Sequence, residues 1–478
     1  MSRVGTRHRR GGSVMAPWRQ RLASFLDLSL LGVAVILMVG VVGIGWGWYL
    51  HSTHDVVIAG GRVIDPESGT EVVRNIGIDN GRITAISELP MNGRLEIPAK
   101  GCIVGPGFID VDSSVRRKYD QEMALKMGVT TVIDGEVGLV GSQVKGLGRL
   151  FVHVALGINE SEFRNGQSLA SGNITSWITD VSKRLDQGYP VIVWTAPNDG
   201  REFGLQLYPL IDLAQRYHAI LSIKLPPMTG PADDSKWHQL IELSQGNQAI
   251  LLVQQLFVHS HIWSHEVLRA LGTPSNAPRL YYSFAPYNGR LMRPSDPSYS
   301  WIRLPGVRLV SYDTGEPLRL ASSRQARWTG SVIAMLTPNS IVEQAMTDSH
   351  SFVGSETNWA AEPRPQFTGT FARVPKRWVI DTGKWQWVTV FQKLSYHPAQ
   401  ELSAAIPGLK NKGVLRVGAD ADLLVIDPKR LDDWATYQHP NQASRGIRHV
   451  FVSGQWVVRD GTFNSKVSPG TLLRSNQP

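Results

Sequence analysis

The sequence predicts an α/β protein: a (β/α)8 TIM-like barrel plus a small β-sandwich, preceded by one transmembrane helix. Two observations predict the barrel and the sandwich. Short apolar or β-branched runs recur through residues 107–412, mostly at spacings that leave room for a helix, and β patterns occupy the segments on either side. The chain has 478 residues, of which 42% are hydrophobic, so it can bury a core of this size.

The first 50 residues predict a membrane anchor at 27–50. Residues 1–26 hold six arginines and no acid, and the segment 28–50 has no charge and ends in Trp46, Trp48 and Tyr49. A bilayer core needs about 20 apolar residues in a helix, and aromatic residues favour its interface. Because no small-residue cleavage motif follows, an anchor is favoured over a signal peptide. The positive-inside rule makes the N-terminus cytoplasmic and the main domain periplasmic or extracellular.

The formal charge of +9 is therefore no sign of a nucleic-acid partner. The first 50 residues carry +5 of it, and the remaining +4 includes no run of lysine or arginine. We expect contact with a membrane through the N-terminal helix, an envelope protein or polymer as a candidate partner, and no nucleic acid. The single cysteine, Cys102, excludes an intramolecular disulfide and any zinc site that needs two thiolates from one chain.

Residues 51–106 and 413–465 alternate between β runs and turns. Asn80-Gly81, between alternating apolar flanks, is a strong hairpin signal. Because the two segments flank the barrel in sequence, we expect them to pair into one composite β-sandwich. The tail, residues 466–478, is polar with Pro and Gly, and we expect it to be frayed.

Eight short runs within residues 107–412 are the expected barrel strands, because parallel strands buried on both faces are apolar or β-branched. The runs are Phe108–Val111, Thr130–Ile133, Phe151–Leu156, Pro190–Trp194, Ala219–Ile223, Ala249–Val253, Leu280–Phe284 and Ser351–Gly354.

Several stretches resemble the N-acyl-D-amino-acid deacylase (D-aminoacylase) branch of the amidohydrolase superfamily. They are DVVIAGGRVIDPESG through GCIVGPGFID, MGVTTVIDGEVG at 127–138, RPQFTGTFARV at 364–374, and the ending from HPAQELSAAIPGLKNKGVLRVGADADLLVIDP to GIRHVFVSGQWVVRDG. The resemblance covers about residues 55–465 and implies a barrel with a composite β-sandwich. It also implies zinc at the C-terminal ends of the strands, where the metal polarises an amide and activates water.

The residues at the positions of the family's metal ligands differ from those ligands. The resemblance places Asp112 and Ser114 where the family has two histidines, Val137 where it has a cysteine, and Lys224 and Gln255 where it has histidines. Glu356 takes the place of the aspartate that serves as general acid/base. Since zinc prefers imidazole, thiolate and carboxylate ligands, we expect the barrel to be retained and the zinc chemistry to be lost.

Other candidate residues leave alternatives open. Asp134 and Glu136 follow a predicted strand and are either pocket acids or part of a solvated turn. His259, His261 and His265 have chelating spacing and form a less favoured metal site. If Lys224 projects toward Asp112 and Glu356, its ammonium group would replace part of the charge of the lost ion.

The favoured interpretation is a membrane-anchored, extracytoplasmic amidohydrolase-like protein without zinc hydrolysis, a binding or scaffold component of the cell envelope that needs no cofactor. The alternative is an active hydrolase of N-acyl-D-amino acids or a related non-peptide C–N bond. In that case Glu356 is the acid/base and zinc is the cofactor.

Overall fold

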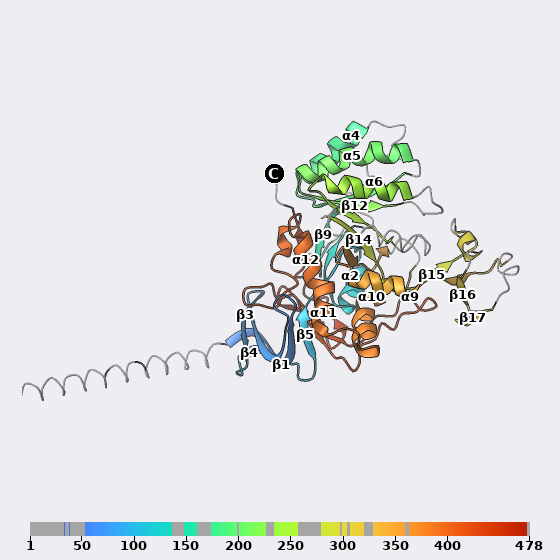
Figure 1. Ribbon diagram of the computed structural model, residues 1–478. Coiled ribbons are helices and arrows are strands. Elements are labelled where there is room, and N and C mark those ends of the chain that lie inside the picture. The colour runs from blue at the N-terminus through green and yellow to red at the C-terminus, as the bar shows by residue number, and fades with distance from the viewer. Residues whose placement is uncertain are drawn as a thin grey trace, which may run out of the picture.

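The computed structural model (Figure 1) describes ten stretches of the chain, together with Val33 and Met38. The stretches are residues 53–135, 148–159, 174–197, 200–225, 234–256, 279–296, 299–303, 306–319, 328–358 and 363–475. The predicted anchor, residues 27–50, lies outside them apart from Val33 and Met38. No helix within the described stretches is both long enough and apolar enough to cross a bilayer.

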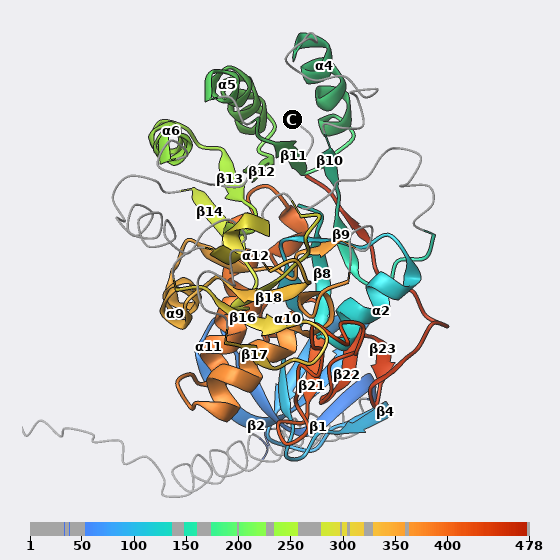
Figure 2. The ribbon, with the colours of Figure 1, turned by 90° about the vertical axis from the view of Figure 1, so that its right-hand side faces the viewer.

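All eight predicted runs form strands of the barrel that pair in parallel, and Figure 2 shows those from β8 to β14. The third strand is split into two pieces by Leu156, and each piece pairs with a different neighbour. In barrel order the strands are β6 (Phe108–Asp110), β8 (Val129–Ile133), β9 (His153–Ala155) with β10 (Gly157–Asn159), β11 (Val191–Thr195), β12 (Ile220–Lys224), β13 (Ile250–Val253), β14 (Leu280–Phe284) and β19 (Ser351–Val353).

Two short strands join the last barrel strand to the first. β20 (Thr357–Asn358) pairs in parallel with β7 (Ser113–Ser114), directly beyond the ends of β19 and β6. Inside the barrel, apolar side chains from most of the strands form one buried cluster that includes Val111, Val193 and Leu252. The strands therefore surround an apolar interior, and polar groups gather at their C-terminal ends.

Helices connect the strands and cover the outside of the barrel, as the spacing of the runs predicts. Figure 1 shows α4, α5 and α6 beside one another on the outer face. The helices are α2 (Lys118–Lys126), α4 (Ile174–Leu185), α5 (Gly200–Arg216), α6 (Asp234–Gln245) and α9 (Asn339–Thr347).

A four-stranded antiparallel sheet is inserted between β14 and α9, and its strands lie outside the eight predicted runs. Its order is β15-β18-β16-β17, and it has its own apolar cluster around Met292, Trp301 and Leu309. Its elements are β15 (Gly289–Met292), η4 (Tyr299–Arg303), β16 (Arg308–Ser311), β17 (Pro317–Leu318) and β18 (Val332–Met335). We call residues 289–335 the inserted sheet.

The two β flanks form one nine-stranded sheet, because β5 pairs antiparallel with β21. The predicted hairpin at Asn80-Gly81 joins β2 to β3, and both turn residues have the positive φ angles that a type I′ turn requires. The strands are β1 (Thr53–Asp65), β2 (Thr70–Asp79), β3 (Arg82–Ser87), β4 (Asn92–Pro98), β5 (Ile103–Pro106), β21 (Leu423–Ile426), β22 (Ile447–Val452), β23 (Gln455–Arg459) and β24 (Thr462–Phe463).

A run of helical segments links the barrel to the second flank. Ala399 and Leu402 of this run pack into the cluster that fills the barrel. The segments are α10 (Gln366–Pro375), η5 (Lys376–Asp381), α11 (Trp387–Phe391), η6 (Gln392–Tyr396), α12 (His397–Leu402) and η7 (Pro407–Leu409).

The prediction of a frayed tail is wrong for residues 466–475. β25 (Leu472–Leu473) pairs in parallel with β9. This edge of β9 is open to β25 because β11 pairs with β10, on the other side of Leu156. Leu473 is buried in the same cluster that fills the barrel. The tail is ordered because it supplies both a strand partner and an apolar side chain.

A buried ion pair joins the nine-stranded sheet to the barrel. Lys412 Nζ lies 2.6 Å from Asp422 Oδ2, and Asp422 Oδ1 lies 3.3 Å from His153 Nε2. His153 Nδ1 contacts Thr471 Oγ1 at 2.8 Å, so the network reaches the tail. Burial opposes ionisation of Asp422, but Lys412 and His153 outweigh it and hold the pKa of this carboxyl well below its usual range.

Replacing one member of this pair is expected to be costly. Lys412→Met leaves the Asp422 carboxylate buried without its cation and should lower the free energy of unfolding by about 3–5 kcal/mol. Adding Asp422→Asn should recover part of that loss. Denaturant unfolding of the two single variants and the double variant checks this, and strictly additive effects would contradict a direct coupling.

Candidate functional site

The C-terminal strand ends hold two buried carboxylates from the first strand. Asp110 Oδ2 accepts a hydrogen bond from Ser355 Oγ at 2.5 Å, and Oδ1 accepts one from Ser355 N at 3.1 Å. The backbone N–H of Asp112 also donates to Asp110 Oδ1, at 3.2 Å. Asp110 therefore ties β6 to the segment that follows β19.

Asp112 is fully buried and begins a second chain of hydrogen bonds. Ser283 Oγ, on β14, donates to Asp112 Oδ2 at 2.5 Å, and the backbone N–H of Gln255 donates to Ser283 Oγ at 3.0 Å. A Cβ added to Gly354 would lie 2.6 Å from the Asp112 Cβ, so glycine is required there for Asp112 to fit. These contacts link the ends of the first, sixth, seventh and eighth strands.

Glu356 and Gln255 both have backbone angles in the left-handed region, with φ of 54° and 51°. This region is uncommon for residues other than glycine, and such residues cluster at binding and catalytic sites. Glu356 lies three residues beyond the end of β19 and directly before β20, and only 6% of its surface is exposed. Glu356 therefore lies beyond the end of the eighth barrel strand, and its role as an acid/base stays a prediction.

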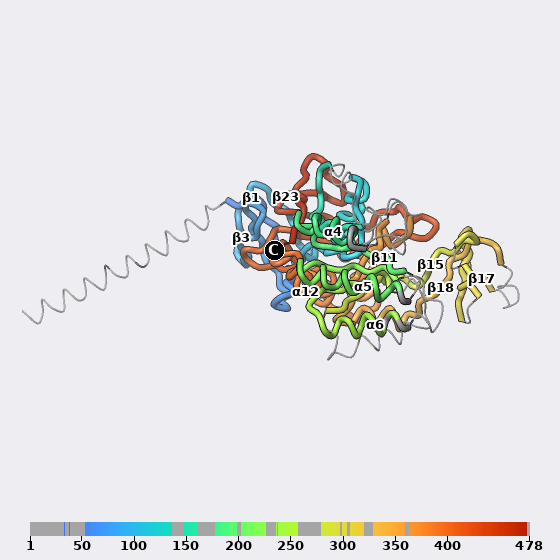
Figure 3. Tube along the Cα trace, turned by 90° about the horizontal axis from the view of Figure 1, so that it is seen from above, coloured from blue at the N-terminus to red at the C-terminus, as the bar shows by residue number. Residues whose placement is uncertain are grey.

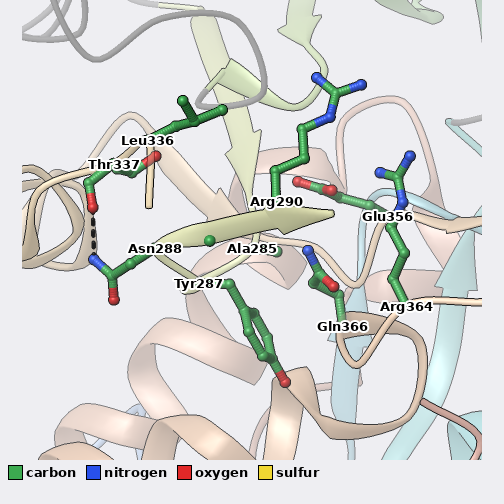
Figure 4. Close-up of a pocket in the computed structure, with 10 residues that line it drawn as sticks. Ala285, Tyr287, Asn288, Arg290, Leu336, Thr337, Glu356, Arg364 and Gln366 are labelled. Carbon is green, nitrogen blue, oxygen red and sulfur yellow. Dashed lines mark hydrogen bonds between the residues drawn. The ribbon is translucent and has the colours of Figure 1, made fainter. Parts of the chain in front are cut away.

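Glu356 lines a small pocket of about 30 Å³ between the barrel end and the inserted sheet (Figure 4). Arg290 comes from β15, and Arg364 precedes α10. In Figure 4 the side chains of these two arginines and of Glu356 extend into the same region, whereas the ring of Tyr287 points away. The other lining residues are Ala285, Asn288, Gly289, Leu336, Thr337 and Gln366.

Arg290 interacts electrostatically with both Arg364 and Glu356. Burial lowers the pKa of Arg290, the nearby Arg364 lowers it further, and Glu356 acts in the opposite direction. With all three groups ionised, these lining residues carry two positive charges and one negative charge, and the carboxylate of Asp296 also acts on Arg290. Two guanidinium groups in a half-buried space suit an anionic ligand.

A second layer of side chains fixes the start of β15, and with it Arg290. The Tyr437 hydroxyl donates to the Gly289 carbonyl, and Arg373 Nε donates to the Pro286 carbonyl at 3.0 Å. The Arg373 guanidinium lies 4.4 Å from the centre of the Tyr287 ring and pairs with Asp433 at 2.7 Å. Arg290 is therefore held by packed polar contacts rather than by a loose loop.

The other predicted site residues are placed as follows. Ser114 lies in β7, where its Oγ accepts a hydrogen bond from Arg116 Nε at 3.3 Å. Asp134 is buried at the end of β8, which excludes the solvated-turn alternative for it. Lys224 ends β12 and is half-buried, and its pairing with Asp112 and Glu356 stays a prediction. Outside the described residues lie Glu136, Val137, His259, His261 and His265.

The described donor set does not fit zinc. A catalytic zinc site uses three protein ligands drawn from imidazole, thiolate and carboxylate groups. At the positions that correspond to the family's ligands, Ser114, Lys224 and Gln255 offer a hydroxyl, an ammonium and an amide, and one oxygen of Asp112 already accepts from Ser283. Within the described stretches no three His, Cys, Asp or Glu side chains are grouped so as to hold a metal.

Sequence reasoning missed Asp110, Ser283 and Arg290. Asp110 was quoted only as part of a motif, and Ser283 lies within an apolar run. Arg290 belongs to the inserted sheet, whose apolar alternation around 289–292 and 332–335 was the one available signal. Arg364 is the first residue of the motif RPQFTGTFARV, but the motif did not predict a function for it.

Comparison with known proteins gives relatives along most of the chain. The D-aminoacylase of Alcaligenes xylosoxydans xylosoxydans is 22% identical over 88% of this chain and 98% of its own length. The N-acyl-D-aspartate deacylase of the same organism is 24% identical over 88% of this chain and 95% of its own length. No protein-family model matches the chain.

Solved structures agree on the fold. The N-acyl-D-glutamate deacylase of Bordetella bronchiseptica, complexed with zinc and a phosphonate inhibitor, superposes with a TM-score of 0.68 and 21% identity, covering 89% of this chain and all of its own. A D-aminoacylase structure superposes with a TM-score of 0.67 and 19% identity over 88% of this chain. At this level of identity the likeness shows the amidohydrolase fold alone.

The buried Asp110 gives a prediction about pH. Burial raises its pKa from 3.8 to about 6, although the hydrogen bonds from Ser355 act in the opposite direction. The folded state thus keeps the proton longer than the unfolded chain. The resulting stability is fully present below about pH 4 and is lost as the pH rises through about 6.

Relative to the wild type, Asp110→Asn should therefore gain up to about 3 kcal/mol of stability between about pH 4 and about pH 7. Thermal unfolding of both chains across this range measures the difference. If the difference is the same at every pH, the raised pKa of Asp110 is refuted.

Proposed function

Because the homologues of this chain in sequence and in structure are N-acyl-D-amino-acid deacylases of the amidohydrolase superfamily, we propose that it binds a related carboxylate-bearing amide without hydrolysing it through zinc. One observation carries the proposal. The strand-end positions that resemble the family's metal site hold a donor set unfit for zinc, beside a pocket with two arginines. The barrel then serves as a rigid frame for recognition.

The pocket suits a small anionic group. A volume of about 30 Å³ has room for roughly two water-sized atoms, which matches the two oxygens of a carboxylate. Guanidinium groups bind carboxylates through paired, charge-assisted hydrogen bonds. In this proposal Arg290 and Arg364 hold the carboxylate, and the remainder of the ligand lies outside the small pocket. When no ligand is bound, the negative charge of Glu356 offsets the repulsion between Arg290 and Arg364.

The cellular setting is part of the proposal. Residues 27–50 anchor the chain, residues 1–26 face the cytoplasm, and the barrel lies on the periplasmic or extracellular side as a binding or scaffold component of the envelope. Its support is the uncharged segment 28–50 and the arginines that precede it.

A second candidate function is favoured by Glu356. The residue is buried at the end of the eighth strand with a left-handed backbone, which is where a general acid/base would stand. In this candidate the chain hydrolyses an N-acyl-D-amino acid or a related amide, with Glu356 moving the proton.

Ligand binding tests the first proposal. N-acetyl-D-glutamate should bind the chain more tightly than its diamide analogue, and Arg364→Gln should weaken binding about tenfold or more through loss of a charge-assisted hydrogen bond. Arg216→Gln, on the outer helix α5, is the matched control and should leave affinity unchanged. Calorimetric titration provides the affinities. Equal affinity for acid and diamide would refute carboxylate recognition.

Hydrolysis distinguishes the two candidates. The first proposal expects no release of acetate from N-acetyl-D-amino acids by the purified chain. Turnover that is abolished by Glu356→Gln and kept by Arg216→Gln would establish the second candidate instead.

A further inference from the structure

The positive charge of the region beyond residue 50 is concentrated in the inserted sheet. Residues 289–335 contain seven arginines, no lysine and three acids, a net charge of +4. This equals the whole formal excess of residues 51–478, so the remainder of that region is neutral. Five of these seven arginines and all three acids lie in residues that the structure describes, so the described part of the inserted sheet has a net charge of +2.

Three of these arginines are exposed: Arg303 at the end of η4, Arg308 at the start of β16 and Arg319 directly after β17. None of them forms an ion pair with any residue that the structure describes. By contrast, two exposed arginines of the nine-stranded sheet have acidic partners: Arg62 pairs with Glu71, and Arg94 pairs with Asp55. The charge of the inserted sheet is thus available to something outside the described chain.

Strand register brings two of the three together. Leu309 pairs with Leu318 in the antiparallel β16–β17 hairpin. Continuing the register by one residue places Arg308 opposite Arg319, on the same face and about 5 Å apart between Cβ atoms. Like charges directly opposite each other destabilise a sheet, and an external anion would relieve this repulsion.

The acids of the hairpin do not neutralise the pair. Asp313 and Glu316 lie in the turn, several residues from the open end where Arg308 and Arg319 stand. At about 3.3 Å per residue, the acids of the turn lie roughly 10 Å from the arginines of the open end. This distance is about one Debye length in physiological salt, so the acids are largely screened from the arginines.

The inserted sheet also lies far from the start of the described body. In Figures 1 and 3, the beginning of β1 and the strands β15 to β17 are at opposite ends of the molecule. Since the proposed anchor precedes β1, a membrane at residue 53 would face away from these arginines. A lipid headgroup of that membrane is therefore a poor candidate for the partner.

We propose that the exposed arginines of the inserted sheet form a docking surface for an acidic polysaccharide, with Arg303, Arg308 and Arg319 binding its carboxylates. Guanidinium groups match carboxylates in shape and donors, which accounts for arginine without lysine. A polysaccharide presents carboxylates at fixed intervals, whereas a flexible acidic peptide loses more conformational freedom on binding. The inference goes beyond the carboxylate pocket at Arg290 and Arg364, because these three side chains do not line it.

The experiment uses the full chain in neutral detergent, with polygalacturonate as the probe and dextran as the uncharged control. The full chain should bind polygalacturonate with an affinity that falls as salt rises, and should not bind dextran. The triple variant R303Q/R308Q/R319Q should bind about tenfold or more weakly, from the loss of three exposed ion contacts. R62Q/R94Q/R430Q removes the same charge from exposed sites elsewhere and should lose less than about threefold.

Three results would overturn the proposal. The first is an equal loss of affinity in the two triple variants, which would make net charge the cause. The second is binding to polyglutamate or to anionic phosphatidylglycerol vesicles more than tenfold tighter than to polygalacturonate. The third is unchanged binding of polygalacturonate by the arginine variant. If R303Q/R308Q/R319Q fails to fold by circular dichroism, the single variant Arg319→Gln replaces it and should still lose affinity.

The same titration separates this proposal from the proposed function. Arg364→Gln should leave polygalacturonate binding unchanged, because its side chain belongs to the pocket. Loss of polymer binding in that variant would assign the polymer to the pocket and overturn the separate surface.

Discussion

The buried carboxylate of Asp110 is the constraint on which the site depends. It accepts two hydrogen bonds from Ser355 and one from the backbone of Asp112, and so ties the first barrel strand to the end of the last. The hydrogen bonds between Asp110 and Ser355 position Glu356, which follows Ser355 in the sequence. The left-handed backbone of Glu356 leads the chain into β20. Because β20 pairs with β7, the segment from Ser355 through β20 joins the ends of the first and last barrel strands. The same segment places the Glu356 carboxylate in the pocket.

Hydrogen bonds join the residues at the strand ends. Asp112, Ser283 and the backbone of Gln255 form a continuous chain across the barrel end. A buried polar group requires a partner. Here the Ser283 hydroxyl supplies one to the Asp112 carboxylate, whereas in a zinc site the ion would do so. Arg290 and Arg364 bring positive charge to the same pocket from elements that cover the barrel.

The sequence predicted the barrel well for a physical reason. Strands buried on both faces must be apolar, so their runs are visible without an alignment, and each of the eight appears as a strand. The inserted sheet was missed because its strands have four residues or fewer and lie among arginines, prolines and serines. The polarity of the tail predicted fraying. The tail is ordered because β25 pairs with the edge of β9 and Leu473 packs into the cluster that fills the barrel. The described residues that the resemblance places, such as Asp112 and Lys224, lie at or just beyond strand ends. Arg290 could not be placed from the sequence, because its approach to Glu356 depends on the inserted sheet.

The central claim is that the strand ends of this barrel no longer bind zinc. Elemental analysis of the chain, purified without chelator and dialysed against zinc-free buffer, tests it most directly. The account predicts far less than one tightly held zinc per chain, and no change on Asp112→Ala. About one zinc per chain, lost on Asp112→Ala, would contradict it.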